Sequence, residues 1–215
     1  MMPGQHDTAP ILTSGAAREA GQALCSAQPT MLLWGVPIPL SSPSACALRR
    51  DLVDVLDRLG EKPTSRSEPD GLLDLGAAGL VIVEVKVHSG PNMKEPDYAH
   101  WDTYLGGLPF DGDNAIRESG FYELARYWRI GWDLAEDRPF AVFSLGPADL
   151  FARNDLPAQL ASFQKGLATQ ERHRVFRVVD WPAFLKPAVP LAGSWFRDYC
   201  RERGIWSPSD SDEEH

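Results

Sequence analysis

Several features that would point to familiar classes of protein are scarce or absent in this chain of 215 residues. No segment approaches the roughly 20 consecutive apolar residues of a membrane-spanning helix, so we expect no membrane partner. The first 30 residues lack the basic stretch followed by an apolar one that marks a secretory leader. The three cysteines lie far apart and without CxxC spacing. They predict neither a disulfide framework nor a zinc site, and they fit a cytoplasmic location.

Sequence motifs of three large enzyme classes are also missing. The chain has no GxSxG, no Walker A loop and no GxGxxG that opens a helix. These absences disfavour a serine hydrolase, a P-loop NTPase and a dinucleotide-dependent enzyme. The histidines His88, His100 and His173 are not spaced like zinc ligands.

The charge balance is acidic, with 21 basic and 30 acidic residues and a net charge of −9. Such a balance argues against indiscriminate nucleic-acid binding through a global basic field. The acidic excess is concentrated in the N-terminal half, whereas residues 117–209 carry 13 basic and 11 acidic residues. This distribution leaves room for a basic face in the C-terminal half, for which Arg172, Arg174 and Arg177 are candidates.

With 43% hydrophobic residues, the chain has enough apolar material for one compact core. Residues 1–29 are rich in small residues and weakly periodic, which predicts a loose N-terminal arm with a short helix at 14–24. Residues 30–206 are expected to form a single domain. Residues 207–215 carry four acids and no apolar residue, which predicts a disordered acidic tail.

Between the two tails, helical and extended patterns alternate along the chain. Residues 71–75 and 80–87 read as the two strands of a hairpin, joined by a glycine-containing turn. A long loop is expected from 89 to about 112. The remaining expected elements are helices at 44–59, 117–136, 155–169 and 194–203 and strands at 140–145 and 175–179. The order predicts an α/β fold with a central mixed sheet flanked by helices.

The residues that indicate chemistry lie on the predicted hairpin. Side chains two apart on a strand face the same way, so Glu84 and Lys86 share a face, and Asp70 lies where it can converge with them. Charged groups within a run of Val, Ile and Leu are costly to bury without a partner or a metal. Alternatively, Glu84 and Lys86 point outward from an ordinary edge strand. Ile82, on the same face as Glu84, favours the buried arrangement.

Two neighbouring carboxylates and hard oxygen ligands are typical of a Mg²⁺ site. The expected ligands are Asp70, Glu84 and the carbonyl of Val85, with Mn²⁺ as a substitute ion. The ammonium of Lys86 would then orient a water molecule or stabilise charge on a phosphate. Asp74 is an alternative ligand on the same strand, although an exposed or supporting position is favoured for it.

Pro69-Asp70, thirteen intervening residues and Glu84-Val85-Lys86 at the end of an apolar strand resemble the motif of the PD-(D/E)xK nuclease superfamily. This resemblance implies a restriction-endonuclease-like core, in which the two acids bind Mg²⁺ and the lysine assists the nucleophilic water. It covers roughly residues 44–145. The strand expected before Asp70 has little room after Gly60, so it is either very short or supplied by residues 31–36.

Members of the exonuclease branch of that superfamily also carry QxxxY on the helix after the lysine strand. Here the corresponding helix has Glu123 and Tyr127 at the same spacing, so tyrosine matches and glutamate replaces glutamine. A glutamate can contribute to a metal site but has no amide hydrogen to donate. Arg126 and Arg129 on this helix are candidate phosphate contacts or a solvated edge. Trp101 and Tyr104 in the long loop are candidates for contacting a base or covering the site.

The sequence therefore predicts a Mg²⁺-dependent nuclease that hydrolyses phosphodiester bonds, with DNA as the expected substrate. Its catalytic group would comprise Asp70, Glu84, Lys86, Glu123 and Tyr127. Two alternatives remain open. One is a non-catalytic interaction module on the same scaffold, and the other is a nuclease subunit active only within a larger defence or repair complex. Assembly as a homodimer is compatible with all three.

Overall fold

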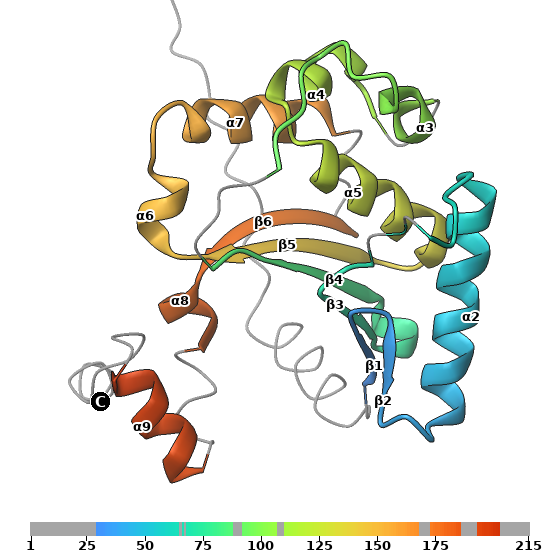
Figure 1. Cartoon of the computed structure of the whole chain (residues 1–215), viewed down its shortest axis with the longest axis vertical. Helices are drawn as coiled ribbons and strands as arrows, with labels where there is room; N and C mark the ends of the chain where they lie inside the picture. Colours follow the sequence, from blue (N-terminus) through green and yellow to red (C-terminus); the bar gives the residue numbers. More distant parts are fainter. Residues whose placement is uncertain are drawn as a thin grey trace, which may run out of the picture.

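A six-stranded mixed sheet with helices packed against it forms the centre of the computed structural model (Figure 1). The structure describes residues 29–64, 66, 68–87, 92–106, 110–167, 173–185 and 193–202. The strands are β1 (Thr30–Leu33), β2 (Val36–Ile38), β3 (Gly71–Asp74), β4 (Leu80–Val85), β5 (Phe140–Gly146) and β6 (Arg174–Asp180). This architecture confirms the predicted α/β class with a central mixed sheet.

The strand order is β2-β1-β3-β4-β5-β6, and the sheet changes character at β4. The pairs from β2 to β4 are antiparallel, whereas β4, β5 and β6 run parallel to one another. The predicted hairpin is confirmed, with β3 and β4 joined through the short 3-10 helix η1 (Gly76–Ala78). Because β4 lies between β3 and β5, it is an internal strand and not an edge strand.

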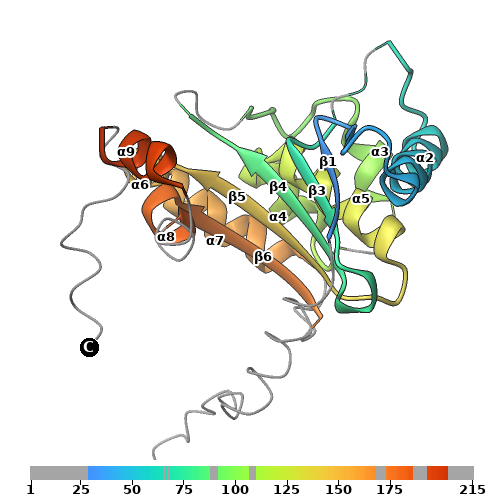
Figure 2. The same cartoon turned by 90° about the horizontal axis from the view of Figure 1, so that it is seen from below.

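Helices cover one face of the sheet. In Figures 1 and 2, α4, α5 and α7 lie over that face and α8 and α9 lie near the end of β6. Helix α2 packs against β1 and β2. The helices are α2 (Pro43–Arg58), α3 (Trp101–Leu105), α4 (Asp113–Ser119), α5 (Tyr122–Ala135), α6 (Ala148–Phe151), α7 (Leu156–Gly166), α8 (Trp181–Leu185) and α9 (Ser194–Glu202). None of the helices in the described part of the chain has the length and apolar character needed to cross a membrane.

Helix α2 follows directly from its sequence. The Ser42 hydroxyl accepts a hydrogen bond from the amide of Ala45 at 3.2 Å and caps the helix, and Pro43 occupies the first turn, where no amide donor is required. The apolar stripe of the helix is buried against the rest of the core; it includes Leu48, Leu52, Val55 and Leu56. Gly60 then takes a positive φ of 74°, which ends the helix as predicted.

The single helix predicted over residues 117–136 is wrong, because the chain forms two helices there. Gly120 adopts a φ of +76° between α4 and α5 and ends the first helix. The Ser119 hydroxyl stabilises the break, since it donates to the carbonyl of Ile116 and accepts from the amide of Phe121. The second helix is buried on two sides, because Trp128 and Ile130 are both fully buried.

Two further expectations need correction. The loop expected over residues 89–112 contains helix α3, and the Trp101 ring is fully buried, with its indole N–H donating to the carbonyl of Glu95 at 2.9 Å. Trp101 is therefore a core residue and has no exposed face for a base. Residues 31–36 do not form one strand, because the chain turns at Trp34 and Gly35. Strand β1 nevertheless supplies the expected neighbour of β3.

Other predicted segments lie outside the described residues. These are residues 1–28 of the N-terminal arm, with the helix expected at 14–24, and the acidic tail at 207–215.

Candidate active site

The β3–β4 hairpin brings Asp70 and Glu84 to the same face of the sheet. Gly71 pairs with Val83, so the register places Asp70 opposite Glu84 one position further along. Leu72 and Ile82, two residues back on each strand, face the same way and are buried beneath the helices. Asp70 and Glu84 thus lie on the core face of the sheet, at the end of the hairpin away from its turn. The alternative prediction, in which Glu84 points outward, is wrong.

Both carboxylate oxygens of Asp70 are held by donors. One accepts a hydrogen bond from the amide of Val85 at 2.7 Å, and the other accepts from the indole N–H of Trp34 at 2.8 Å. Trp34 lies in the β1–β2 turn with a φ of +49°, and 65% of its surface is exposed. Sequence reasoning missed this residue. The Trp-Gly pair between two short apolar runs was the available signal for a tight turn.

Glu84 is a buried carboxylate, with 4% of its surface exposed. Burial raises its pKa to about 7, and the hydrogen bond from Lys86 opposes that rise, while the charges of Glu123 and Asp70 add to it. The carboxylate of Glu84 therefore sits among other carboxylates and exchanges its proton near neutral pH.

Lys86 follows the last residue of β4, and its amide donates to the carbonyl of Leu145 on β5 at 2.7 Å. Its ammonium contacts the carboxylate of Glu84 and donates to Glu123 at 2.9 Å. Burial alone would lower the pKa of Lys86, but the hydrogen bonds and charges of Glu84 and Glu123 outweigh it and raise that pKa. The side chain is thus held as a cation, suited to stabilising negative charge and not to accepting a proton.

Helix α5 supplies the remaining two predicted residues. Glu123 lies in its first turn, where the helix dipole favours a negative charge. Tyr127 lies one turn later and is 1% exposed. Burial, followed by the charges of Glu84 and Glu123, raises the pKa of the Tyr127 hydroxyl above its usual range. All five predicted catalytic residues therefore gather at the end of β4, drawn from three separate segments of the chain.

The side-chain oxygens of the cluster determine which metal ion could bind there. Within the described ranges, no three His, Cys, Asp or Glu side chains are grouped so that they could hold a metal ion. Magnesium is commonly held in proteins by only one or two carboxylates, with waters and substrate phosphates as the other ligands. Asp70 and Glu84 on one face meet that requirement, and each carboxylate has lone pairs beyond those used by its present donors. The chemistry of these residues thus fits a hard divalent cation.

The local charge also fits a cation. The cluster has three carboxylates, those of Asp70, Glu84 and Glu123, against the single ammonium of Lys86. Val85 adds a backbone oxygen at the same position. Its amide faces Asp70, and in an extended strand the carbonyl of a residue points to the same side as its amide.

Several other candidates lie away from this cluster. Asp74 is at the opposite end of β3, where its carboxylate accepts from the amide of Gly76 at 2.8 Å and from Arg138 at 2.9 Å. Arg174 stacks on the Trp132 ring at 3.2 Å from its centroid, level with the start of β4 and not its end. Asp74 thus stabilises a turn, and the suggested arginine patch does not border the site through Arg174.

The two helix arginines considered as phosphate contacts are engaged elsewhere. Arg129 donates to Asp133 at 3.1 Å and to the carbonyl of Gly106 at 3.0 Å. Arg126 is buried in a two-pronged ion pair with Glu61, at 2.6 and 2.8 Å. Neither side chain forms the solvated helix edge that was the alternative interpretation.

A cavity of about 500 Å³ adjoins the cluster. Sequence reasoning singled out three of its residues, Tyr104, Glu123 and Arg126, but missed Glu61, Tyr98 and Tyr122. The lining includes Glu61, Tyr98, Tyr104, Tyr122, Glu123 and Arg126. Glu123 therefore belongs both to the cavity wall and to the Lys86 cluster.

Comparison of the chain with models of protein families, with curated proteins and with solved structures found no match.

Proposed function

We propose that this protein is a Mg²⁺-dependent nuclease of the PD-(D/E)xK type that hydrolyses phosphodiester bonds in DNA. One observation carries the proposal: Asp70, Glu84, Lys86 and Glu123 converge at the end of an internal strand, joined by contacts to Val85 and between the side chains. The order of helix α2, hairpin β3–β4, helix α5 and strand β5 supports a restriction-endonuclease-like core, which this motif implies.

In the proposed mechanism, Asp70, Glu84 and the Val85 carbonyl would hold Mg²⁺. When bound, the ion supplies Lewis-acid polarisation of the phosphate and lowers the pKa of a coordinated water. The amide of Val85 and the indole of Trp34 orient the Asp70 carboxylate. Lys86, kept protonated by Glu84 and Glu123, positions the attacking water and stabilises the charge that develops on the phosphoryl oxygens.

Glu123 acts through Lys86 in this mechanism. Its carboxylate accepts from the ammonium at 2.9 Å and so fixes the direction in which the remaining N–H donors point. Tyr127, one turn further along α5, fills the space behind Glu84 and Glu123 and keeps that side of the cluster dry. Both residues are therefore expected to position the catalytic groups without reacting themselves.

A cleavage assay tests the proposal. Single-stranded, double-stranded and branched DNA are incubated with the wild type, Lys86→Ala and Asp70→Asn in Mg²⁺ or Mn²⁺. We expect both substitutions to slow cleavage by about a hundredfold or more, because each removes an electrostatic group of the site. Asp74→Asn is the matched control, since it changes the same residue type at the other end of β3, outside the cluster, and it should retain activity.

The alternatives predict different results. Equal inertness of the wild type and Lys86→Ala on all three substrates would contradict an enzyme that acts alone. Calorimetry with Mn²⁺ then separates the remaining cases. A nuclease subunit of a larger complex should still bind the ion through Asp70 and Glu84, and a non-catalytic interaction module should not.

A further inference from the structure

The cavity beside the catalytic cluster has the size and position of a binding site. Its volume of about 500 Å³ lies within the roughly 300–1,000 Å³ of small-molecule sites in proteins. Its walls come from the segment after α2, from α3 and from the first turns of α5. Glu123, which contacts Lys86 at 2.9 Å, lines it. A group bound there would therefore lie next to the proposed reacting phosphate.

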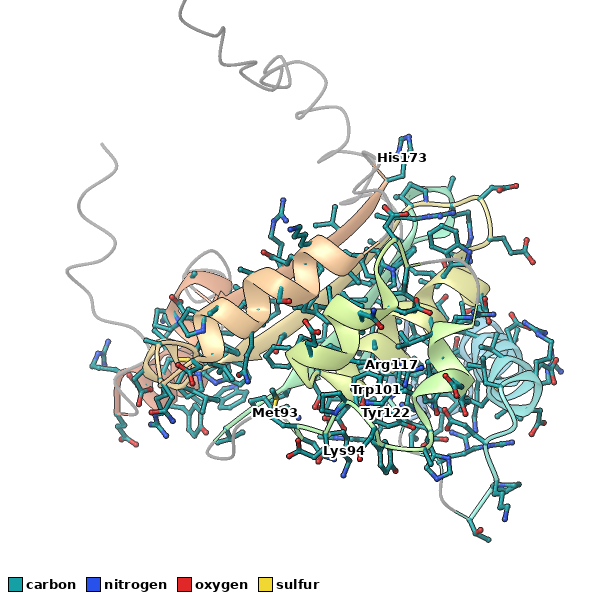
Figure 3. The ribbon with its side chains drawn as sticks, turned by 90° about the horizontal axis from the view of Figure 1, so that it is seen from above. Met93, Lys94, Trp101, Arg117, Tyr122 and His173 are labelled. Atoms are coloured by element: carbon teal, nitrogen blue, oxygen red, sulfur yellow. The ribbon has the colours of Figure 1, made fainter. Side chains whose placement is uncertain are left out.

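One wall of the cavity is aromatic. Tyr98 and Tyr104 each meet Tyr122 edge to face, with ring centroids 5.0 and 5.4 Å apart. Trp101 supports Tyr122 from the core at 5.2 Å, and Figure 3 shows these two rings close together, with Met93 and Lys94 nearby. Rings that pack edge to face hold one another in fixed orientations and still offer π surface to a flat ligand.

Next to this wall, the lining contains a hydrogen-bonded polar group. Glu61 accepts from the Tyr104 hydroxyl at 2.7 Å and from two nitrogens of Arg126, and the side chains of Glu61 and Arg126 are 9% and 4% exposed. The third guanidinium nitrogen, Nη1 of Arg126, is buried and has no hydrogen-bond partner in the described part of the chain. A buried donor without an acceptor is destabilising, and such groups are uncommon in native proteins. Because Arg126 lines the cavity, a ligand with an acceptor is one group that would satisfy this donor after a small movement of the side chain.

The charges of the lining indicate what kind of ligand it fits. Among the described lining residues, the acids Glu61 and Glu123 balance the bases Lys62 and Arg126. A balanced site gives little net attraction to a free phosphate. It suits a neutral, flat molecule with both donors and acceptors on its edge, and a nucleobase has that character.

We propose that this cavity receives the base of a nucleotide adjacent to the cleaved phosphate, an inference that rests on the proposed nuclease function. The base stacks on the tyrosine wall and hydrogen-bonds with Glu61 and Arg126. A base within a duplex is paired and stacked, so it must be unpaired before it can enter. The substrate class is therefore DNA with unpaired nucleotides at the cleavage site.

The test uses single-stranded oligonucleotides that carry one 2-aminopurine at successive positions, with Ca²⁺ in place of Mg²⁺ so that the bound strand is followed without cleavage. We expect fluorescence quenching at one position, where the base stacks in the cavity. Tyr98→Ala should weaken binding of the strand by about tenfold, near the lower part of the range for loss of a stacking side chain, and remove the quenching. Tyr98→Phe keeps the ring and should retain both.

Two further variants keep the result interpretable. Tyr199→Ala changes a tyrosine on α9 that does not line the cavity and should bind like the wild type. Thr103 is exposed and lines the cavity, so Thr103→Leu adds bulk there without removing a core contact, and it should also reduce quenching. If Tyr98→Ala unfolds the protein, Thr103→Leu decides the matter alone.

The outcomes separate this inference from the proposed function. Cleavage in Mg²⁺ with no position quenched, or with quenching unchanged in Tyr98→Ala and Thr103→Leu, overturns the base pocket and leaves the nuclease standing. Position-specific quenching without cleavage supports the pocket and overturns the independent enzyme. Absence of any oligonucleotide binding overturns the inference.

Discussion

Glu84 combines two properties that pull in opposite directions. It lies on the core face of the sheet, where an apolar residue would normally be found, and it contacts the cation that neutralises it. Burial raises the pKa of the carboxyl group from 4.5 to about 7, so the folded protein binds this proton more tightly than the unfolded chain does. Ionisation of Glu84 therefore lowers the stability of the folded protein.

The direction of the resulting pH dependence of stability can be tested with the metal-free protein. Because the folded pKa is raised, the contribution of Glu84 to stability is full below about pH 4.5 and is lost as the pH rises to about 7. The free energy of unfolding of the wild type should therefore fall relative to that of Glu84→Gln across this interval, by at most about 1.4 kcal/mol per pH unit. Urea denaturation with a chelator present measures both curves, and a constant difference between them would contradict the burial of a titrating Glu84.

Trp34 is a second residue at which function and stability conflict. It occupies the first position of a two-residue turn in which Trp34 and Gly35 have φ values of +49° and +69°. Such turns favour Asn-Gly, and a bulky side chain at positive φ is strained. Trp34 donates its indole N–H to Asp70, so the strained turn orients a carboxylate that we propose as a metal ligand.

We predict that Trp34→Asn raises the free energy of unfolding by about 1 kcal/mol, because asparagine relieves the strain, while cleavage activity falls. Trp34→Phe retains the strain and most of the ring but removes the N–H donor. It should lose activity without gaining stability. Thermal unfolding and a cleavage assay on the same preparations measure both effects, and full activity in both variants would exclude a role for the Trp34–Asp70 bond.

At the scale of elements, the break between α4 and α5 determines where Glu123 lies. Gly120 has a positive φ, and a methyl group added there would meet the end of Met93 at 2.8 Å and the carbonyl of Lys94 at 3.4 Å. Helix α5 starts two residues later, and Glu123 lies in its first turn. The conformation of one glycine thus sets the position of a group that contacts Lys86.

Gly60 offers a matched control for this position, because its φ is +74° and nothing lies within 4 Å of an added methyl group. Gly60→Ala should lower the free energy of unfolding by about 1 kcal/mol, which is the cost of placing an alanine at a positive φ. Gly120→Ala should cost at most about 1 kcal/mol more, because the crowded atom is the terminal methyl of the flexible Met93 side chain, and it should also reduce cleavage. Chemical denaturation of the two variants gives the difference, and equal losses would mean that Met93 moves aside freely.

The sequence predicted the features that depend on local patterns and missed those that depend on contacts between distant residues. The period-two alternation of β4 and the glycine-containing turn before it are local signals, and they were sufficient to predict the hairpin and the shared face of Asp70 and Glu84. The break at Gly120 was missed because helical periodicity continues across it. The contacts of Trp34 with Asp70 and of Glu61 with Arg126 join residues 36 and 65 positions apart, and no local pattern encodes such contacts.

At the scale of the whole molecule, a net charge of −9 opposes the approach of a polyanion. The proposed site adds three carboxylates to this repulsion where the phosphate must lie. Divalent cations are therefore expected to matter for binding as well as for hydrolysis.

We predict that the affinity for an oligonucleotide falls by about tenfold or more when Ca²⁺ is replaced by a chelator, and that its dependence on KCl is shallow, corresponding to about three phosphate contacts or fewer. Asp70→Asn should abolish the stimulation by Ca²⁺ while binding in chelator stays equal or improves, because one negative charge is removed. Fluorescence anisotropy over a salt series measures these quantities. Equal affinity with and without Ca²⁺ would show that the strand binds away from the carboxylates.

The tyrosine wall and the carboxylates occupy different stretches of the polypeptide. Tyr98 and Tyr104 lie between β4 and α4, on a segment that adds no strand to the sheet, whereas Asp70 and Glu84 lie where the pairing of β3 with β4 fixes them. Substitutions or insertions in the first stretch should therefore alter the proposed base pocket and leave the proposed catalytic cluster unchanged. Among related proteins, substitutions that change nucleotide preference should occur mainly in the segment that carries the tyrosines. Substitutions in the β3–β4 hairpin should be rare.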